Sequence, residues 1–224
     1  MHKRLQLLAL ILSLINLPNL AQPSASLYFT TAIPVDDFSE YNSNVGFGGA
    51  MELFLFSPSE KLPYGFGINL SYIGYGIHFL EDPDSEHLDM SFNKANNFAS
   101  AHILFQIAPH TGSVRPYFET LFGGSYIFSR TEMGYAYHHP QTLWVDDWVW
   151  SYGWGVGLKL LAHGDPVFNS GSVYLDLKVR YMMSTETTYL DRNSVAFYDG
   201  VIEYNLIKSK TDMVIVFLGL FFFF

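Results

Sequence analysis

The stretch Met213–Phe224, with the sequence MVIVFLGLFFFF, decides how the rest of this chain is interpreted. It carries apolar residues up to the carboxyl end, where soluble domains are usually frayed. It is too short for a membrane-spanning helix, which needs about 20 residues, but long enough for a tilted membrane-spanning strand, which needs about 9–11. With a period of two residues, Gly219 lies on the inner face and the outer face carries Val214, Val216, Leu218, Leu220, Phe222 and Phe224. We therefore predict a final transmembrane β-strand.

The amino-terminal segment has the features of a secretory signal peptide. A basic head, Met1–Arg4, precedes the apolar run Leu5–Leu17, and Pro18–Ala21 follows before a polar start at Gln22. A buried core helix or a membrane anchor is the alternative, but the run is short for an anchor. We predict a signal peptide over residues 1–21 and one barrel domain over residues 22–224.

Composition excludes several classes of protein. The chain has no cysteine, which excludes disulfides and a lipoprotein anchor. Charged residues make up 15%, against about 25% in ordinary proteins. Of the 12 basic residues Lys3 and Arg4 fall in the leader, which leaves 10 against 21 acidic residues and a net charge of −11. Nucleic-acid binding is not expected, because it needs clustered Lys and Arg. We predict no cofactor and no metal ion.

Alternating apolar residues divide the chain into eight predicted strands, an even number as in bacterial single-chain barrels. They are Ser26–Ala32, Val45–Leu55, Tyr64–Tyr72, Ala99–Ile107, Arg115–Phe128, Trp150–Leu160, Val173–Tyr181 and Met213–Phe224.

The predicted connections alternate strictly in length. Three are short and rich in Pro, Gly and Ser: Ser57–Pro63, Pro109–Ser113 and His163–Ser170. Four are long and polar or acidic: Pro34–Asn44, Glu81–Ser91, Gly134–Asp147 and Asp191–Lys210. Long extracellular loops and short periplasmic turns are typical of outer-membrane barrels. The predicted fold is all-β, an eight-stranded antiparallel up-and-down transmembrane β-barrel; a soluble β-sandwich or lipocalin-like barrel is the alternative.

The inward positions of these strands carry a polar set with three acids and three bases. Its predicted members are Glu52, Asn69, His102, Gln106, Glu119, Lys159, Asp176, Lys178 and Arg180. An eight-stranded barrel is only wide enough for side chains to fill, which favours a rigid polar plug over a proton or ion path. Inward Gly153, Gly155 and Gly157 would make room for long side chains such as Arg180.

Aromatic residues on the outward positions are predicted to lie at the two membrane interfaces. Tyr28 and Tyr64 would lie at the periplasmic end of their strands. The opposite end would carry Tyr72, Tyr126, Trp148, Trp150 and Tyr181.

The segments Arg115-Pro116-Tyr117-Phe118 and Ser209-Lys210-Thr211-Asp212, with a last strand that ends in Phe, carry a family resemblance. The mature chain resembles small eight-stranded outer-membrane barrels of the OmpA-domain or OmpX kind, and uncharacterised Bacteroidetes-type barrels in particular. The resemblance implies the outer membrane of a Gram-negative bacterium, with lipid and lipopolysaccharide as neighbours. It also implies that Phe222 and Phe224 form a C-terminal signal for the outer-membrane insertion machinery.

Candidate catalytic and metal-binding residues are few. Lipid A deacylases of this fold carry a Ser two residues after a His, and no histidine here has one; His102 follows Ser100 in the reverse order and faces inward. The acidic loop Glu81–Asp89 holds five carboxylates but lacks the EF-hand spacing, so we predict a solvated loop, with weak divalent-cation binding as a minor alternative. We predict no catalytic residue.

Two loop features are candidates for surface contacts. His138–His139 and Trp144–Trp148 form one group, which would be adhesive or would anchor the chain at the membrane interface. Val195–Tyr198 and Val201–Tyr204 flank Asp199-Gly200, a hairpin dipeptide. We predict a monomeric, non-catalytic outer-membrane protein with a structural or surface-interaction role through four long, mostly acidic loops. A lipid-modifying enzyme and a narrow porin-like pore for small solutes are the alternatives.

Overall fold

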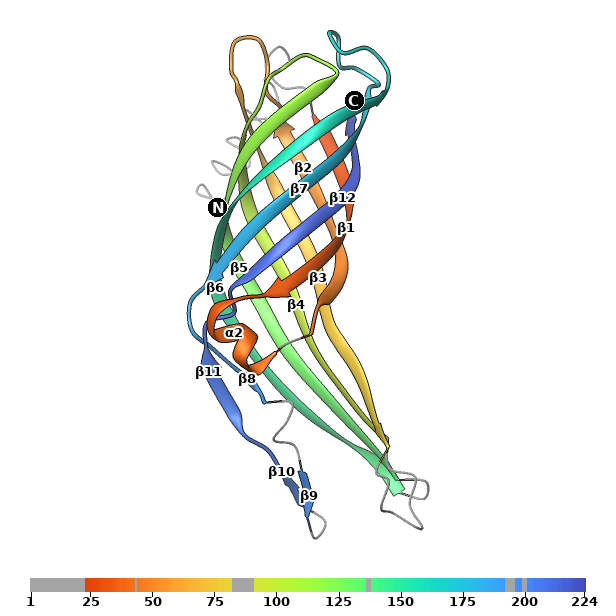
Figure 1. Ribbon diagram of the computed structural model, residues 1–224, viewed down its shortest axis with the longest axis vertical. Helices are drawn as coiled ribbons and strands as arrows, with labels where there is room; N and C mark the ends of the chain where they lie inside the picture. The colour runs from red at the N-terminus through yellow and green to blue at the C-terminus, as the bar shows by residue number, and fades with distance from the viewer. Residues whose placement is uncertain (1–22, 43, 82–90, 136–137, 192–195, 199–200) are drawn as a thin grey trace, which may run out of the picture.

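The chain forms a closed antiparallel barrel of eight strands. The computed structural model describes residues 23–42, 44–81, 91–135, 138–191, 196–198 and 201–224. Around the barrel the order is β1-β12-β7-β6-β5-β4-β3-β2 (Figure 1). The bounds are β1 Ser24–Pro34, β2 Gly46–Phe56, β3 Tyr64–Glu81, β4 Ser91–Ile107, β5 Val114–Tyr135, β6 His138–His163, β7 Val173–Ser184 and β12 Met213–Phe223. The eight predicted strands and the fold class are confirmed.

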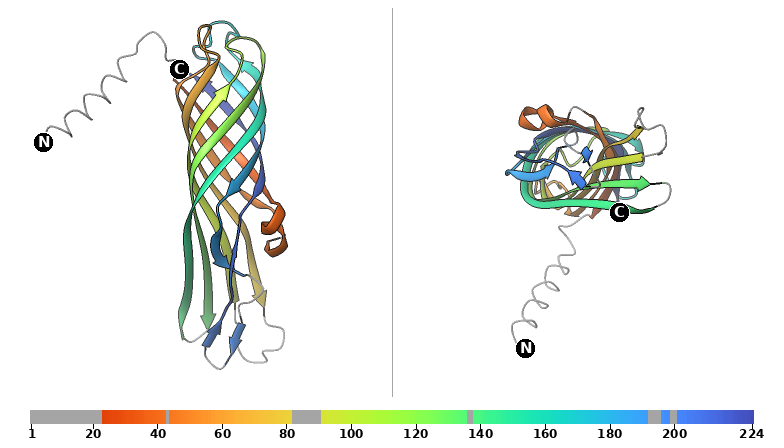
Figure 2. Two further views of the ribbon diagram at one scale, coloured as in Figure 1. Left: turned by 90° about the vertical axis from the view of Figure 1, so that its left-hand side faces the viewer. Right: turned by 90° about the horizontal axis from the view of Figure 1, so that it is seen from below.

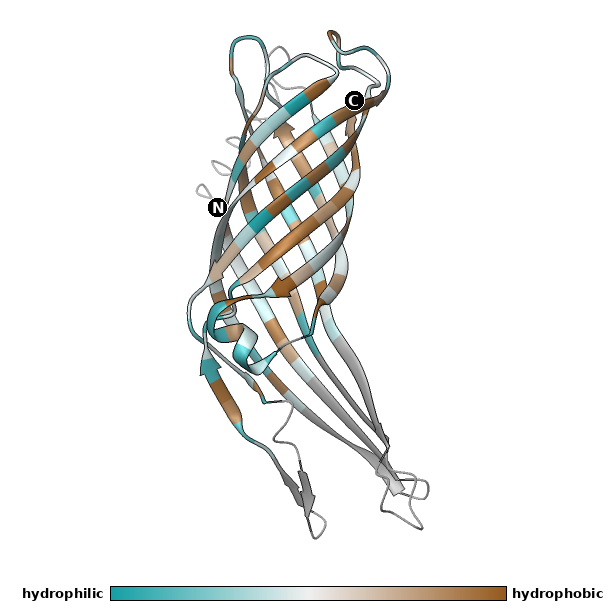
Figure 3. Ribbon diagram, viewed as in Figure 1, coloured by the Kyte–Doolittle hydropathy of each residue, from teal (hydrophilic) through white to brown (hydrophobic). Residues whose placement is uncertain are grey.

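Alternation along each strand decides which residues face the lumen. On β6, Trp154 and Val156 are about half exposed on the outer wall, whereas Lys159 on the opposite face is buried. β12 repeats the pattern, with Leu218 outward and Phe217 inward. Figure 3 shows apolar and polar residues alternating along the ribbons of the barrel wall. The first and last strands pair from Ser24 opposite Phe223 to Pro34 opposite Met213, so the barrel has no free edge.

Strands β3 to β6 are much longer than the other four and extend beyond them at one end, at the bottom of Figure 1 and of the left view in Figure 2. The prediction that Gly134–Asp147 is a loop is wrong, since β5 continues to Tyr135 and β6 begins at His138. Likewise β4 begins at Ser91 rather than Ala99. These extensions are polar, but ladder pairs such as Phe128 with Asp146 satisfy the backbone whatever the side chains. We call this the long-strand end.

The three predicted short connections, Ser57–Pro63, Pro109–Ser113 and His163–Ser170, correspond to residues 57–63, 108–113 and 164–172 of the structure. They lie at the opposite end together with the C-terminus. We call it the short-turn end. Here Arg115 donates hydrogen bonds to the carbonyl oxygens of Gly112 (2.9 Å) and Pro166 (3.0 Å) and to the side chain of Asn169. Its guanidinium also lies 4.5 Å from the ring centroid of Tyr174. Arg115 therefore closes the lumen at this end.

Helix α2, Asp36–Tyr41, lies beside the barrel wall where β1 ends, within the predicted loop Pro34–Asn44 (Figure 2). Its Phe38 is buried and makes edge-on ring contacts. The ring centroid of Phe38 lies 5.5, 5.7 and 5.7 Å from those of Tyr75, Phe98 and Tyr189. Burial raises the pKa of the Tyr189 phenol, whose hydroxyl shares a 2.8 Å hydrogen bond with Ser209. An aromatic cluster thus covers the lumen where an open pore would have its entrance.

Short strands occupy the predicted loop Asp191–Lys210 and the residues just before it. β8, Thr187–Leu190, pairs with β11, Leu206–Ser209, and β9, Ala196–Tyr198, pairs with β10, Val201–Glu203. The predicted hairpin about residues 195–204 is confirmed for these two strands; its tip, Asp199-Gly200, lies outside the described residues.

Several predictions fall wholly or largely outside the described part of the chain. They are the signal peptide over residues 1–21 and, apart from Glu81, the acidic loop Glu81–Asp89. Within the described ranges no group of three or more His, Cys, Asp or Glu side chains is placed to hold a metal ion. The described helix is neither long nor apolar enough to cross a membrane.

Gly157 tests how tightly the inward face is packed. A Cβ atom at this position would collide with the ring of Tyr117. We expect Gly157→Leu to lower the free energy of unfolding by about 1–3 kcal/mol, because overpacking displaces neighbours. The neighbouring substitution Val156→Leu is the control, since Val156 is 51% exposed on the outer wall. Urea titration of the refolded barrel in detergent measures both, and equal midpoints would contradict the inward packing.

Candidate functional site: the charged barrel interior

The polar interior is assembled from inward positions on strands β2 to β7. Antiparallel pairing places Glu119 and Arg180 on either side of Gly155. Because Gly155 has no side chain, the guanidinium of Arg180 can cross over strand β6; a Cβ there would lie 3.2 Å from a carboxylate oxygen of Glu119. The prediction that the inward glycines make room for long side chains therefore holds at this position.

Two carboxylates and two cations form a buried quartet at the centre. Lys178 Nζ lies 2.5 Å from Glu52 Oε1 and 3.5 Å from Glu119 Oε2. Arg180 Nη2 lies 2.8 Å from Glu52 Oε1 and 2.5 Å from Glu119 Oε1. The side chains of these residues are at most 2% exposed. Each carboxylate therefore contacts both cations, which is the arrangement that compensates the cost of burying charge.

The third acid, Asp176, is held by tyrosines. The hydroxyl of Tyr117 donates to its Oδ1 at 2.6 Å and that of Tyr28 lies 2.8 Å from its Oδ2. The same Tyr28 hydroxyl lies 3.1 Å from Glu52 and so connects Asp176 to the quartet. The prediction that Tyr28 faces outward at the periplasmic membrane interface is wrong, since Tyr28 is 6% exposed. It shares the inward face of β1 with Ser26 and Thr30.

The third base, Lys159, is held by an amide and by aromatic faces. Its Nζ donates to Gln106 Oε1 at 2.6 Å and lies 3.6 Å from the ring centroid of Phe221 and 4.7 Å from that of Tyr117. Among the described residues no carboxylate lies within ion-pair distance of Lys159. Cation–π contacts replace an ion pair here and are worth about 2 kcal/mol when desolvated.

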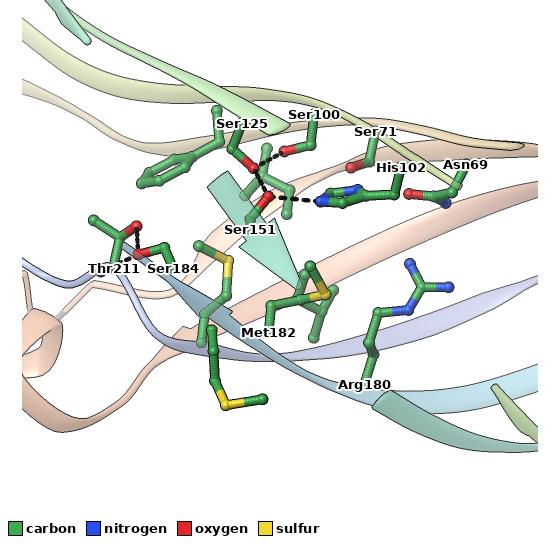
Figure 4. Close-up of a pocket in the computed structure, with 15 residues that line it drawn as sticks. Asn69, Ser71, Ser100, His102, Ser125, Ser151, Arg180, Met182, Ser184 and Thr211 are labelled. Carbon is green, nitrogen blue, oxygen red and sulfur yellow. Dashed lines mark hydrogen bonds between the residues drawn. The ribbon is translucent and has the colours of Figure 1, made fainter. Parts of the chain in front are cut away.

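A cluster of hydrogen-bonded hydroxyl groups lies beside His102, on the side of the quartet that faces the long-strand end (Figure 4). His102 Nε2 lies 2.7 Å from Ser151 Oγ, and Ser125 links Ser151 to Ser100 through two 2.8 Å hydrogen bonds. His102 Nδ1 has no hydrogen-bond partner among the described residues, nor has Asn69 Oδ1, although Asn69 Nδ2 donates to Glu52.

A small cavity adjoins His102, Ser125, Ser151 and Arg180. Its volume is about 20 Å³, and a site of about 10–15 Å³ accommodates one water molecule. The Ser151–His102 pair therefore lacks both an acid on Nδ1 and the space for an acyl substrate, which a hydrolytic triad requires. The geometry supports neither hydrolysis at this pair nor a continuous aqueous path through the lumen.

The structure places all nine predicted interior residues, Glu52 to Arg180, inside the barrel at 0–4% exposure. It unites Glu52, Glu119, Lys178 and Arg180, and sets Asp176, Lys159 and His102 in adjoining networks. Sequence reasoning missed the roles of Tyr28 and Tyr117 and the serine cluster. Strict alternation along β1 was sufficient to place Tyr28 inward; the serines offered no such signal, because short polar residues occur on either face.

The described part of the chain also places the two terminal phenylalanines on the outer wall. Phe222 is half-buried and Phe224 is 66% exposed.

No protein family and no curated protein matches this chain. Solved structures that share the barrel architecture are distant. Ail, the attachment invasion locus protein of Yersinia pestis, is 14% identical over 91% of this chain and 99% of its own, with a TM-score of 0.44. Neisserial surface protein A is 13% identical over 90% of this chain and 97% of its own, with a TM-score of 0.41. The N-terminal β-barrel domain of Pseudomonas aeruginosa OprF is 11% identical over 91% of this chain and 100% of its own, with a TM-score of 0.39.

Removing one charge from the quartet tests its contribution to stability. We expect Glu52→Gln to lower the free energy of unfolding by about 3–5 kcal/mol, because Lys178 and Arg180 would keep buried charge with fewer partners. Glu60→Gln, in the exposed turn after β2, is the matched control and should change stability by less than about 0.5 kcal/mol. Urea titration in detergent checks both; a similar midpoint for the two variants would refute the quartet's role.

Proposed function

We propose that this chain is a non-catalytic outer-membrane β-barrel protein of a Gram-negative bacterium, with a structural or surface-interaction role. The observation that carries the proposal is a closed barrel with an apolar outer wall and a filled, charged interior. Leu27, Phe29 and Leu55 are 57–59% exposed on that wall. A soluble monomer rarely exposes a large contiguous apolar surface, whereas lipid would cover it. The wall thus favours the membrane over the soluble alternatives.

The long-strand end would lie outside the cell and the short-turn end in the periplasm. Lipid and lipopolysaccharide would surround the wall of a monomer, and the insertion machinery would recognise the last strand. The strand extensions, α2 and the β8–β11 ribbon are the surfaces open to an extracellular partner. The finer likeness to Bacteroidetes-type barrels rests on residues 115–118 and 209–212.

The filled lumen argues against the porin-like alternative. Phe38 covers one mouth, the quartet occupies the centre and Arg115 closes the other end. The lipid-modifying alternative lacks support at His102, whose only described side-chain partner is Ser151. A structural or surface role is the reading that these observations favour.

Fractionation and gel migration test the proposal directly. We expect the chain in the outer-membrane fraction, and a shift in apparent mass between unboiled and boiled samples, because a closed barrel resists detergent until heated. We also expect no conductance steps in planar bilayers, since side chains fill the lumen. Recovery in the soluble periplasmic fraction would refute the membrane assignment, and ohmic steps abolished by boiling would refute the plug.

Phe224 offers a test of the insertion signal. It is 66% exposed and outward, so Phe224→Ala should barely affect refolding in detergent micelles. We expect the same variant to accumulate less in the outer membrane in cells, because the insertion machinery would read the terminal residue. Leu220→Ala, 43% exposed on the same face of β12, is the control. Equal accumulation of both variants would contradict a signal at Phe224.

A further inference from the structure

A hollow on the outer wall of the barrel has an unusual floor. It has a volume of about 690 Å³ and spans strands β1 to β6. Its floor comes from outward positions with the smallest side chains, Gly49 on β2 and Ala99 and Ala101 on β4. Met51 and Leu70 flank the floor in the ladder row of Ala101, which is one outward position nearer the short-turn end than the row of Gly49 and Ala99. The surrounding wall is otherwise built from large apolar residues.

Aromatic residues at the opposite side hold the hollow open. Tyr72 lies between Gly49 and Ala99 in the ladder, and its hydroxyl donates to Asn97 at 2.9 Å. Tyr126, opposite Ala99 on β5, donates to Asp146 at 2.7 Å. The two acceptors, Asn97 and Asp146, each lie one outward position nearer the long-strand end than the tyrosines. These hydrogen bonds draw the two rings away from the floor.

Trp148 forms one wall of the hollow. A Cβ atom on Gly124 would collide with the indole, so the missing side chain at Gly124 lets Trp148 lie against strand β5. The indole is nevertheless 56% exposed, which leaves one of its sides open to an occupant. The hollow is therefore a shaped part of the wall, with an apolar floor and hydroxyl, amide and carboxylate groups at one end only.

We infer that this hollow binds one acyl chain of a lipid from the outer leaflet, with the lipid's polar end toward Asn97 and Asp146. The inference rests on the proposed membrane location. The apolar floor matches a hydrocarbon chain, and the polar groups lie on the side where headgroups begin. A second copy of the barrel fits poorly, because a convex wall cannot reach a floor that lies below Met51, Leu70 and Trp148.

Photo-crosslinking tests the site in reconstituted vesicles. The probe is phosphatidylethanolamine with a diazirine in its acyl chain, diluted into unlabelled lipid. We expect labelling of β2 and β4 to exceed that of β7 and β12 several-fold, and native mass spectrometry to retain one lipid per barrel. The variant Ala99→Leu/Ala101→Leu should reduce both signals to the level of the rest of the wall, because leucines fill the floor.

The control is Val179→Leu/Val216→Leu, which enlarges outward residues on β7 and β12 and should leave the labelling unchanged. Ala101→Leu alone is the second variant if the double variant shows no heat-dependent gel shift. Uniform labelling around the barrel, or labelling that the leucine substitutions leave unchanged, would overturn the acyl-chain site. So would a dimer mass for the wild-type chain that the leucine variant loses, because a second copy would then occupy the hollow. A wild-type chain without the gel shift would overturn the proposed function as well, so the two failures are distinguishable.

Discussion

The ion pairing of Glu52 and Glu119 with Lys178 and Arg180 is the interaction on which the rest of the barrel depends. Eight strands enclose a lumen in which opposing side chains meet, so the charges on the inner wall have no bulk water to solvate them. Their main compensation is one another, with further hydrogen bonds to Glu52 from Tyr28 and Asn69. This constraint explains the glycine at position 155, the hydroxyl of Tyr28 between two carboxylates, and the aromatic faces around Lys159. Each brings a partner within reach of a buried charge.

A filled centre also determines what the two ends of the barrel do. Arg115 ties the turns 108–113 and 164–172 together at the short-turn end, where Asn169 adds a bond to the His110 carbonyl oxygen at 2.9 Å. At the long-strand end Phe38 covers the lumen with an aromatic cluster. Because side chains fill the lumen between the ends, the strand extensions of β3 to β6 do not lead into an open channel. They form a surface of their own.

The sequence predicted the strands well because each outward residue must be apolar and each inward one need not be, which produces a period of two. The same reasoning failed at Gly134–Asp147, where both faces of the extension carry polar residues and the period disappears although the ladder continues. It predicted Glu52, Glu119, Lys178 and Arg180 as inward residues, but not which acid contacts which base. The pairing depends on strand register, such as Arg180 opposite Gly155, and register between distant strands is not readable from one chain. Tyr28 was misplaced because its residue type suggested an interface, whereas its position in β1 indicated the lumen.

When side chains fill the interior of a barrel, only its outer wall and its two ends can contact other molecules. In this barrel the outer wall and the long-strand end offer the larger surfaces. On the inner face, the absent side chains of Gly155 and Gly157 leave space for Glu119 and Tyr117. On the outer face, Gly124 leaves space for the indole of Trp148, and Gly49 forms part of the hollow's floor beside Tyr72. Missing side chains therefore shape both faces, but with opposite results. The inner spaces are filled by the chain's own residues, while the hollow on the outer wall remains open. Because neighbouring outward positions such as Leu27 and Leu70 carry full-sized apolar side chains, the open floor is a local departure from the wall's own pattern. Such a departure indicates an occupant from outside the chain.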